Sequence, residues 1–339
     1  MWKDNSRLLR YLLLFACGWA TIVFINYFYN TIALFAVAGI FAALLNYPVV
    51  WLNRYMARWL AITLTFVGAI ALLVGIVALL GSEILNQGQG LLTQLRDLLN
   101  QPDRLPFPAD SLSQLNLSKI LDTLQSGLAT GLSLIRIIFS SIFTGIFGAV
   151  ISLYMLIDGG KLWQAFLKFI PHQSRDRFDR IFRQSFLGFM RGQLLLMLFL
   201  SSTTAIAFPL LGVNYALLLA VILGLIDAIP GIGATLGVTL VIFLVLAAQG
   251  TETAIKVAIV CIALVQIQDN IIRPKVMGDE LDINPVILFL ALFIGQRVAG
   301  LLGIFLSIPI AGMIIAWMRP VEVEANPTLP KDSLENLPS

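Results

Sequence analysis

The sequence predicts an all-α polytopic membrane protein with about eight membrane segments. Hydrophobic residues make up 58% of the 339 residues and charged residues only 12%, a balance unsuited to a water-soluble domain. Several long apolar runs contain no charged residue and no histidine: Tyr11–Asn53, Trp59–Ser82, Ile137–Ile157 and Gly192–Ile226. Each run is long enough for a helix of about 20 residues, the length that crosses the hydrocarbon layer. None shows the alternation of a barrel strand, so the spans are predicted to be helices.

Changes in composition divide the chain into five parts. They are an N-terminal scaffold of transmembrane helices (1–81), an outer amphipathic segment (82–132), a transmembrane helix followed by a basic cytoplasmic helix (133–192), a transport core with broken helices (193–318) and a disordered cytoplasmic tail (319–339). Within these parts we expect spans at about 11–29, 31–52, 59–81, 133–157, 193–212 and 254–272.

Basic residues set the expected orientation. Seven lysines and arginines, against two aspartates, lie between residues 161 and 191. The positive-inside rule therefore places this stretch and both termini in the cytoplasm of a cell whose inner membrane holds the protein. Apolar residues recur at helical spacing beneath the arginines, which predicts an interfacial helix: Phe178, Ile181, Phe182, Phe186 and Phe189.

The same charge pattern indicates partners. The basic residues lie beside membrane helices and not on one soluble face, so membrane lipid or water is expected around them and nucleic acid is not. The outer segment, which contains two amphipathic stretches, is expected to lie on the membrane surface or on neighbouring subunits, and it favours a homo-oligomer.

Two pairs of short apolar segments in the last third are broken by proline and glycine. Residues 214–228 and 234–249 are joined by Ile229–Gly233, and residues 284–296 and 298–317 are joined around Gly295–Arg297. Segments of about 15 residues are short for a membrane crossing, which favours two re-entrant hairpins of opposite orientation. Full crossing by each pair is the alternative.

Asp227 is the first candidate for a functional residue. It is the only charged residue between Arg191 and Glu252, and it lies just before the break at Pro230. A charge at that depth normally faces a partner or an aqueous cavity. Together with the backbone around Pro230, Gly231 and Gly233, it is predicted to form a substrate or ion site. Capping of the broken helix, or pairing with a distant basic residue, is the alternative.

A polar stripe on the span at 254–272 is the second candidate. Four polar residues follow helical spacing there: Gln266, Asp269, Asn270 and Arg273. Such a stripe has to face protein or water, which predicts that it lines a path beside the hairpins. Asp269 and Arg273 could instead simply pair with each other. Gln268 lies about 100° away from this face and is expected to serve packing.

Two further polar residues mark the second hairpin. Arg297 is expected to attract an anion, to neutralise Asp227 or Asp269, or to reach headgroups at the membrane edge, and Asn284 opens the hairpin before a proline.

Enzyme chemistry finds little support in the sequence. His172 is the only histidine and has no neighbours at ligand spacing, so no metal site is expected. No nucleotide-binding loop or other cofactor motif is present, and we expect no enzyme activity.

Three motifs carry a resemblance to a known family. They are Asp227–Gly233, Gln266–Gly278 and Ile283–Pro285, and they resemble the autoinducer-2 exporter family of predicted permeases. The resemblance implies transport and not a reaction, since members are associated with export of small signalling molecules and some with sodium or proton antiport. Many members carry histidine where this chain has Asn284.

The sequence therefore predicts a secondary transporter that exports a small polar metabolite or signal by alternating access. Asp227, Asp269 and Arg273 are the residues expected to couple charge to transport, and Gln266 and Asn270 those expected to contact the solute. A sodium or potassium/proton antiporter is the competing prediction. A scaffold or regulator that transports nothing, acting through the outer segment and the basic helix, is a third.

Overall fold

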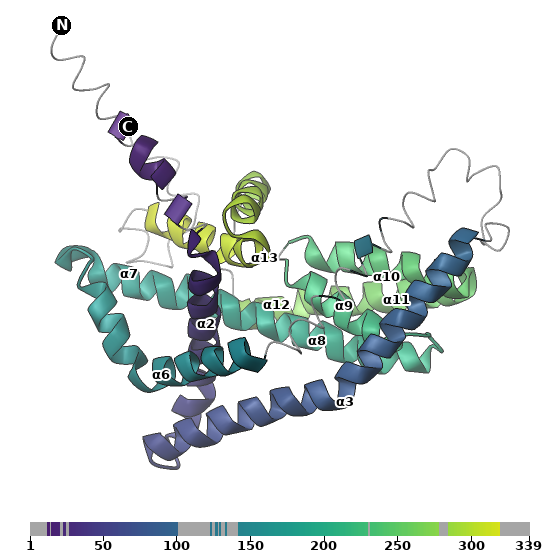
Figure 1. Ribbon diagram of the computed structural model, residues 1–339, viewed down its shortest axis with the longest axis horizontal. Coiled ribbons are helices and arrows are strands. Elements are labelled where there is room, and N and C mark those ends of the chain that lie inside the picture. Colours follow the sequence, from purple (N-terminus) through teal and green to yellow (C-terminus); the bar gives the residue numbers. More distant parts are fainter. Residues whose placement is uncertain are drawn as a thin grey trace, which may run out of the picture.

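The computed structural model describes residues 27–100, 142–229, 231–277 and 284–318, with scattered residues between 12 and 24 and between 123 and 133 (Figure 1). Every regular element in that part of the chain is a helix. Some residues of the first expected span, the Pro-rich part of the outer segment and the whole tail after residue 318 lie outside the described residues. The predicted all-helical class is confirmed.

Three long helices form the N-terminal part. Helix α2 (Tyr29–Leu52) packs on α6 (Ile142–Leu167) and on α3 (Arg58–Asn100). Small side chains allow the close approach, because the buried contacts include Ala42 and Val49 of α2 and Ala61 of α3. Helix α3 has 43 residues and a length of roughly 64 Å, about twice the thickness of the hydrocarbon layer. It does not end near residue 81 but continues into the expected outer segment.

The basic region after α6 folds onto aromatic residues of its neighbours. A short 3₁₀ turn η2 (His172–Ser174), α7 (Arg175–Ile181), the π-helix η3 (Phe182–Gly188) and α8 (Phe189–Leu210) follow one another without interruption. Trp163 of α6 stacks on Phe182 with 4.3 Å between ring centroids, and Phe178 makes an edge contact with Trp317. The apolar face expected at the membrane surface therefore packs largely on protein.

The last part consists of two helical hairpins and one long helix between them. The first hairpin is α9 (Ala216–Asp227) with α10 (Gly233–Gln249). Next come α11 (Thr251–Ile267), the π-helix η4 (Gln268–Ile272) and α12 (Arg273–Met277), which are continuous. Helix α13 (Pro285–Met318) is broken at Ala299 and Gly300, so that it forms the two arms of a second hairpin.

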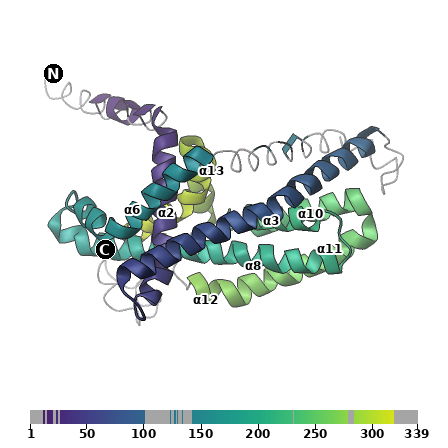
Figure 2. The ribbon, with the colours of Figure 1, turned by 60° about the horizontal axis from the view of Figure 1, so that its bottom comes forward.

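The first hairpin lies in the main core. Helix α9 packs on α8 and α10, and the outer half of α3 runs along both arms (Figures 1 and 2). The core contains aliphatic side chains from five helices: Leu91 and Leu95 of α3, Leu200 of α8, Leu219 and Leu223 of α9, Val241 and Leu244 of α10, and Val257 of α11. Cys261 is buried there as well, as expected of a small apolar residue.

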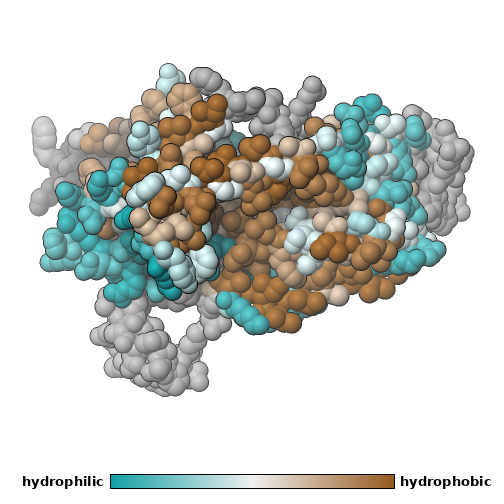
Figure 3. Space-filling view, turned by 90° about the horizontal axis from the view of Figure 1, so that it is seen from below, coloured by the Kyte–Doolittle hydropathy of each residue, from teal (hydrophilic) through white to brown (hydrophobic). Residues whose placement is uncertain are grey.

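Length and surface both fit a membrane protein. Five helices in the described part are long and apolar enough to cross a membrane: Tyr29–Leu52, Arg58–Asp97, Gly145–Leu167, His172–Leu210 and Thr251–Met277. The four hairpin arms are apolar but have only 10–17 residues. Figure 3 shows a wide apolar surface with hydrophilic residues gathered towards two ends. The total of eight membrane segments and the re-entrant form of the hairpins stay predictions.

Candidate functional site

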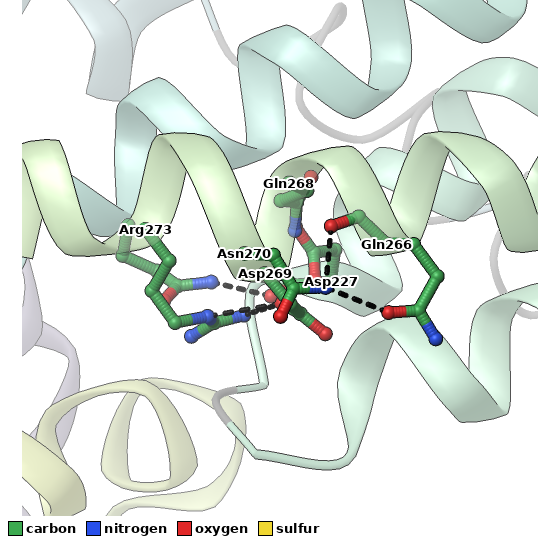
Figure 4. A network of polar contacts seen from close by, with 7 residues as sticks. Asp227, Gln266, Gln268, Asp269, Asn270 and Arg273 are labelled. Atoms are coloured by element: carbon green, nitrogen blue, oxygen red, sulfur yellow. Dashed lines mark hydrogen bonds and ion pairs between the residues drawn. The ribbon is translucent and has the colours of Figure 1, made fainter.

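Asp227 is the last residue of α9 and is buried, with 2% of its surface exposed. Its side-chain Oδ2 accepts a hydrogen bond from Nε2 of Gln268 at 2.9 Å (Figure 4). Its backbone carbonyl, which the end of the helix leaves without an intrahelical partner, accepts a hydrogen bond from the amide of Gln193 on α8. Three elements that are far apart in sequence therefore meet at Asp227, α8 at its backbone carbonyl and η4 at its carboxyl group. We call Gln193, Asp227 and Gln268 the buried triad.

Both glutamines of the buried triad are fully enclosed. Each has 0% of its surface exposed, and each uses its NH₂ group on an oxygen of Asp227. Their Oε1 atoms are also buried and accept no hydrogen bond from the described residues. Since a glutamine amide both donates and accepts, each side chain keeps an unused acceptor beside the carboxyl group. The site thus combines one carboxyl group with two neutral amides.

Gln268 was expected to serve packing because it lies off the face of the polar stripe. Its side chain is buried, whereas Gln266 and Asp269 of the stripe are exposed. Gln268, the first residue of η4, faces Asp227 instead of serving packing alone. Gln193 was missed too, although the argument applied to Asp227 also singles out an isolated glutamine in an apolar run.

The predicted polar stripe lies on the other side of the same helix. Gln266, Asp269 and Asn270 are exposed, and Arg273 is partly exposed. Asn270 Nδ2 donates to Gln266 Oε1 at 2.8 Å, and Arg273 pairs with Asp269 at 3.0 Å (Figure 4). The four residues thus form two neighbouring polar pairs and do not contact the buried triad directly. The pairing of Asp269 with Arg273, one of the two predicted alternatives, is present.

The turn of the first hairpin depends on glycine. Gly231 has φ of +84°, a conformation that side chains rarely adopt, and a side chain there would meet Leu288 of α13. Gly233 lies so close to Ile226 and to the Cα atom of Asp227 that a Cβ atom would overlap their backbone. These two glycines thus shape the turn, and their part in a substrate or ion site stays a prediction. Pro230 lies outside the described residues.

The two hairpins meet beside the buried triad. Ile229 and Ile232, at the turn of the first hairpin, pack in one apolar cluster with Leu288 and Leu292 of the first arm of α13. In the second hairpin the arms approach through Gly295 and Gly303, where an added Cβ atom would overlap the backbone of the other arm. The break itself is held by Tyr29 of α2, whose hydroxyl donates to the Ala299 carbonyl at 3.0 Å.

The sequence that forms this site matches a known family. The family described as AI-2E family transporter matches residues 9–322. The chain belongs to the AI-2E transporter family. It is accordingly a membrane transport protein, and the motifs that indicated the resemblance surround the buried triad and the contact between the hairpins.

Relatives of this AI-2E transporter carry names that agree with a transport function. Two are from Synechocystis sp. (strain ATCC 27184 / PCC 6803 / Kazusa). "Putative transport protein sll0063" is 27% identical over 307 residues, 85% of this chain and 77% of the relative. "Putative transport protein sll0060" is 28% identical over 313 residues, 88% of this chain and 90% of the relative. "Putative transport protein YrrI" of Bacillus subtilis (strain 168) is 32% identical over 131 residues, 38% of this chain and 36% of the relative.

The remaining predicted site residues of this AI-2E transporter lie at the second hairpin. Asn284 precedes Pro285 at the start of α13, and its Oδ1 accepts a hydrogen bond from the Val286 amide at 2.9 Å. This is the geometry of a helix cap with proline in the first turn, so a structural role accounts for Asn284. Arg297 is exposed near the end of the first arm. Asp227 and Asp269 already have other partners, so Arg297 does not neutralise them in this structure.

The polar groups of the site define what it can bind. Among the described residues no three His, Cys, Asp or Glu side chains come together as they would around a metal ion. The buried triad offers a carboxyl group with amides, and the stripe offers two amides and one ion pair. Such groups suit a hydrogen-bonding solute or a proton.

Proposed function

We propose that this AI-2E transporter is a secondary permease that exports a small polar metabolite or signalling molecule by alternating access. The observation that carries the proposal is the contact between two short hairpins beside a buried carboxyl group. Interrupted helices that meet near the middle of the membrane are typical of substrate sites in secondary transporters. A buried carboxyl group within a membrane protein is expensive and is usually functional.

The length of the arms supports re-entrant hairpins. The arms have 12 to 17 residues and therefore lengths of about 18 to 26 Å, against about 30 Å for the hydrocarbon layer. A helix that stops inside the layer needs partners for its free backbone groups. Gln193 supplies one at the end of α9, and Tyr29 supplies one at the break in α13. These fixed partners allow each hairpin to end inside the protein.

The polar stripe is the proposed contact surface for the solute. Gln266 and Asn270 present amide groups, and Asp269 and Arg273 present opposite charges, on an exposed face next to Ile262 and Ile271. Polar groups at membrane depth have to meet water or protein. In the proposed cycle the stripe lines the path, while the hairpins move against α2, α6 and the first half of α3 and open it to one side at a time.

Release of solutes from proteoliposomes tests this function. The vesicles are loaded with a water extract of bacterial metabolites, and mass spectrometry follows which compounds leave. We expect selective loss of one class of small polar solute with the wild type and at least tenfold slower loss with Asn270→Leu. Glu252→Gln, which changes an exposed carboxylate at the start of α11, is the matched control and should release at the wild-type rate. Equal release from protein-free vesicles would contradict the proposal.

Exchange of sodium or potassium for protons is a second candidate function. It is favoured by one observation, which is that the buried Asp227 has neutral amides, and no basic side chain, as its hydrogen-bonding partners among the described residues. A pH-sensitive dye inside the same vesicles tests it, because a cation gradient should then move protons. Proton movement driven by sodium or potassium without any organic solute would favour this candidate over solute export.

A further inference from the structure

We propose that Asp227 is the residue that binds the transported or coupling proton, and that Gln268 and Gln193 are positioning residues that serve its carboxyl group in both protonation states. This proposal rests on the proposed transport function and adds to it the identity of the coupling ion and of the residues that hold it. The observation behind it is the choice of partners: two buried glutamines whose Oε1 atoms accept no hydrogen bond within the described part of the chain.

The hydrogen-bonding groups of the partners distinguish a proton-binding carboxyl group from a carboxylate that stays ionised. An arginine or lysine has only donors and therefore stabilises an ionised carboxylate alone. A glutamine amide donates to a carboxylate through its NH₂ group and accepts from a protonated carboxyl group through its oxygen. Gln268 now donates to Oδ2 of Asp227 at 2.9 Å, and its buried Oε1 has no partner among the described residues. Turning the amide over would present that oxygen to a protonated Asp227.

Gln193 keeps the carboxyl group in place while its proton changes. Its Nε2 donates to the backbone carbonyl of Asp227, a bond that does not depend on protonation of the side chain. Gly233 packs against the Cα atom of the same residue. The main chain of Asp227 is thus held by two contacts, and the side chain alone is left to exchange partners.

The surroundings of the buried triad contain few charges. The element that holds Gln268 contributes Asp269, which is paired with Arg273, and α12 adds Lys275. Helix α8 contributes Arg191, whose guanidinium lies over the Tyr47 ring of α2 at 4.7 Å. Helix α10 has no charged residue, and Arg297 is the single charged residue of α13. The charges of α3 that lie along the hairpin are Glu83, Arg96 and Asp97. Buried apolar side chains such as Leu223 and Val238 occupy the remaining space.

The position of the buried triad in the fold links proton binding to movement of the first hairpin. Asp227 lies at the turn of the first hairpin, which packs on the second hairpin, and Gln268 is the first residue of the π-helix that also bears Asp269. When a proton from the water on one side forms an O–H bond with Oδ2 of Asp227, that oxygen becomes a donor and Gln268 turns its amide so that Oε1 accepts from it. The change alters the hydrogen bond that joins the hairpin turn to the π-helix. Release of the proton to the other side restores that link.

Infrared difference spectroscopy tests proton binding without any knowledge of the solute. The full-length protein in lipid vesicles is titrated from alkaline to acid pH while the C=O stretch of protonated carboxyl groups is recorded. We expect a band that titrates in the wild type and is lost in Asp227→Asn. Asp269→Asn and Glu252→Gln, which change exposed carboxylates, should keep it. In Gln268→Met, which preserves size but removes both polar atoms, the band should move to higher wavenumber because the protonated carboxyl group loses its acceptor.

The outcomes separate this proposal from the proposed function. A titrating band that depends on Asp227 and shifts in Gln268→Met supports the proton site, whether or not solute release is found. Selective solute release with no such band in the wild type would overturn the proton site and leave solute transport standing. A band whose position is the same in Gln268→Met and in the surface control Gln89→Leu would overturn the positioning role of Gln268. Circular dichroism of each variant confirms that it is folded.

Discussion

At the scale of single residues, the hairpins depend on positions where any side chain is too large. Gly295 and Gly303 bring the two arms of α13 so close that an added Cβ atom would overlap backbone atoms and not a flexible side chain. Backbone cannot turn aside as a side-chain end does, so the arms themselves would have to separate. Gly159 of α6, by contrast, has open space around it and lies in a regular helix.

We therefore expect Gly303→Ala to lower the free energy of unfolding by about 1–3 kcal/mol, the usual cost of overpacking. Gly159→Ala is the matched control and should leave stability equal or slightly higher, since alanine is the better helix former. Titration with sodium dodecyl sulfate in mixed micelles measures both. Equal unfolding curves for the two variants would mean that the arms are not packed through Gly303.

A second prediction at the scale of single residues concerns Tyr29. Its hydroxyl is a donor for the Ala299 carbonyl at the break in α13. Loss of one hydrogen bond costs about 1 kcal/mol, so Tyr29→Phe should shift the unfolding curve by that amount, whereas Tyr154→Phe, at a position with an exposed ring, should not. Faster amide hydrogen exchange around Ala299 in Tyr29→Phe alone would show that the hydroxyl holds the break.

At the scale of elements, long apolar runs were predictable and departures from regular helix were not. The charge-free runs located α2, the first half of α3, and α8, because a span needs only length and hydrophobicity. Gln268 lies off the face of the polar stripe, so the periodicity assigned it to packing and its hydrogen bond with Asp227 was not foreseen. The continuation of α3 to Asn100 was not foreseen either, because its polar residues contact the first hairpin and only the structure shows them doing so.

These contacts give α3 a testable role. Gln94 Nε2 donates to the Ala248 carbonyl at 2.7 Å, and Gln87 Oε1 accepts from the Leu218 amide at 3.1 Å, so α3 holds the open end of the first hairpin through both arms. The double variant Gln87→Leu, Gln94→Leu should lose about 1–3 kcal/mol of stability, the sum of two such bonds. Gln89→Leu, on the exposed side of the same helix, should lose little. Micelle unfolding of the three proteins compares them, and equal curves would rule this role out.

At the scale of the whole molecule, helix α7 joins the early helices to the second hairpin. Arg177 of α7 lies 5.2 Å from the centroid of the Trp317 ring and donates to the Ala316 carbonyl near the end of α13. Phe178 contacts Trp317 on one side and stacks towards Trp163 of α6 on the other. The sequence indicated an amphipathic helix here, but periodicity alone could not tell whether lipid or protein covers its apolar face.

If this junction transmits motion between the two halves, Trp317→Leu should loosen both sides of it at once. A cation–π contact and an aromatic contact are together worth about 1–2 kcal/mol, so hydrogen exchange should become faster in α7 and in the second arm of α13 while α9 and α10 keep their wild-type rates. Trp59→Leu, at an exposed position of α3, should change neither region. Faster exchange confined to α13 would mean that α7 does not depend on this contact, because a helix held there would lose its protection together with the arm that it contacts.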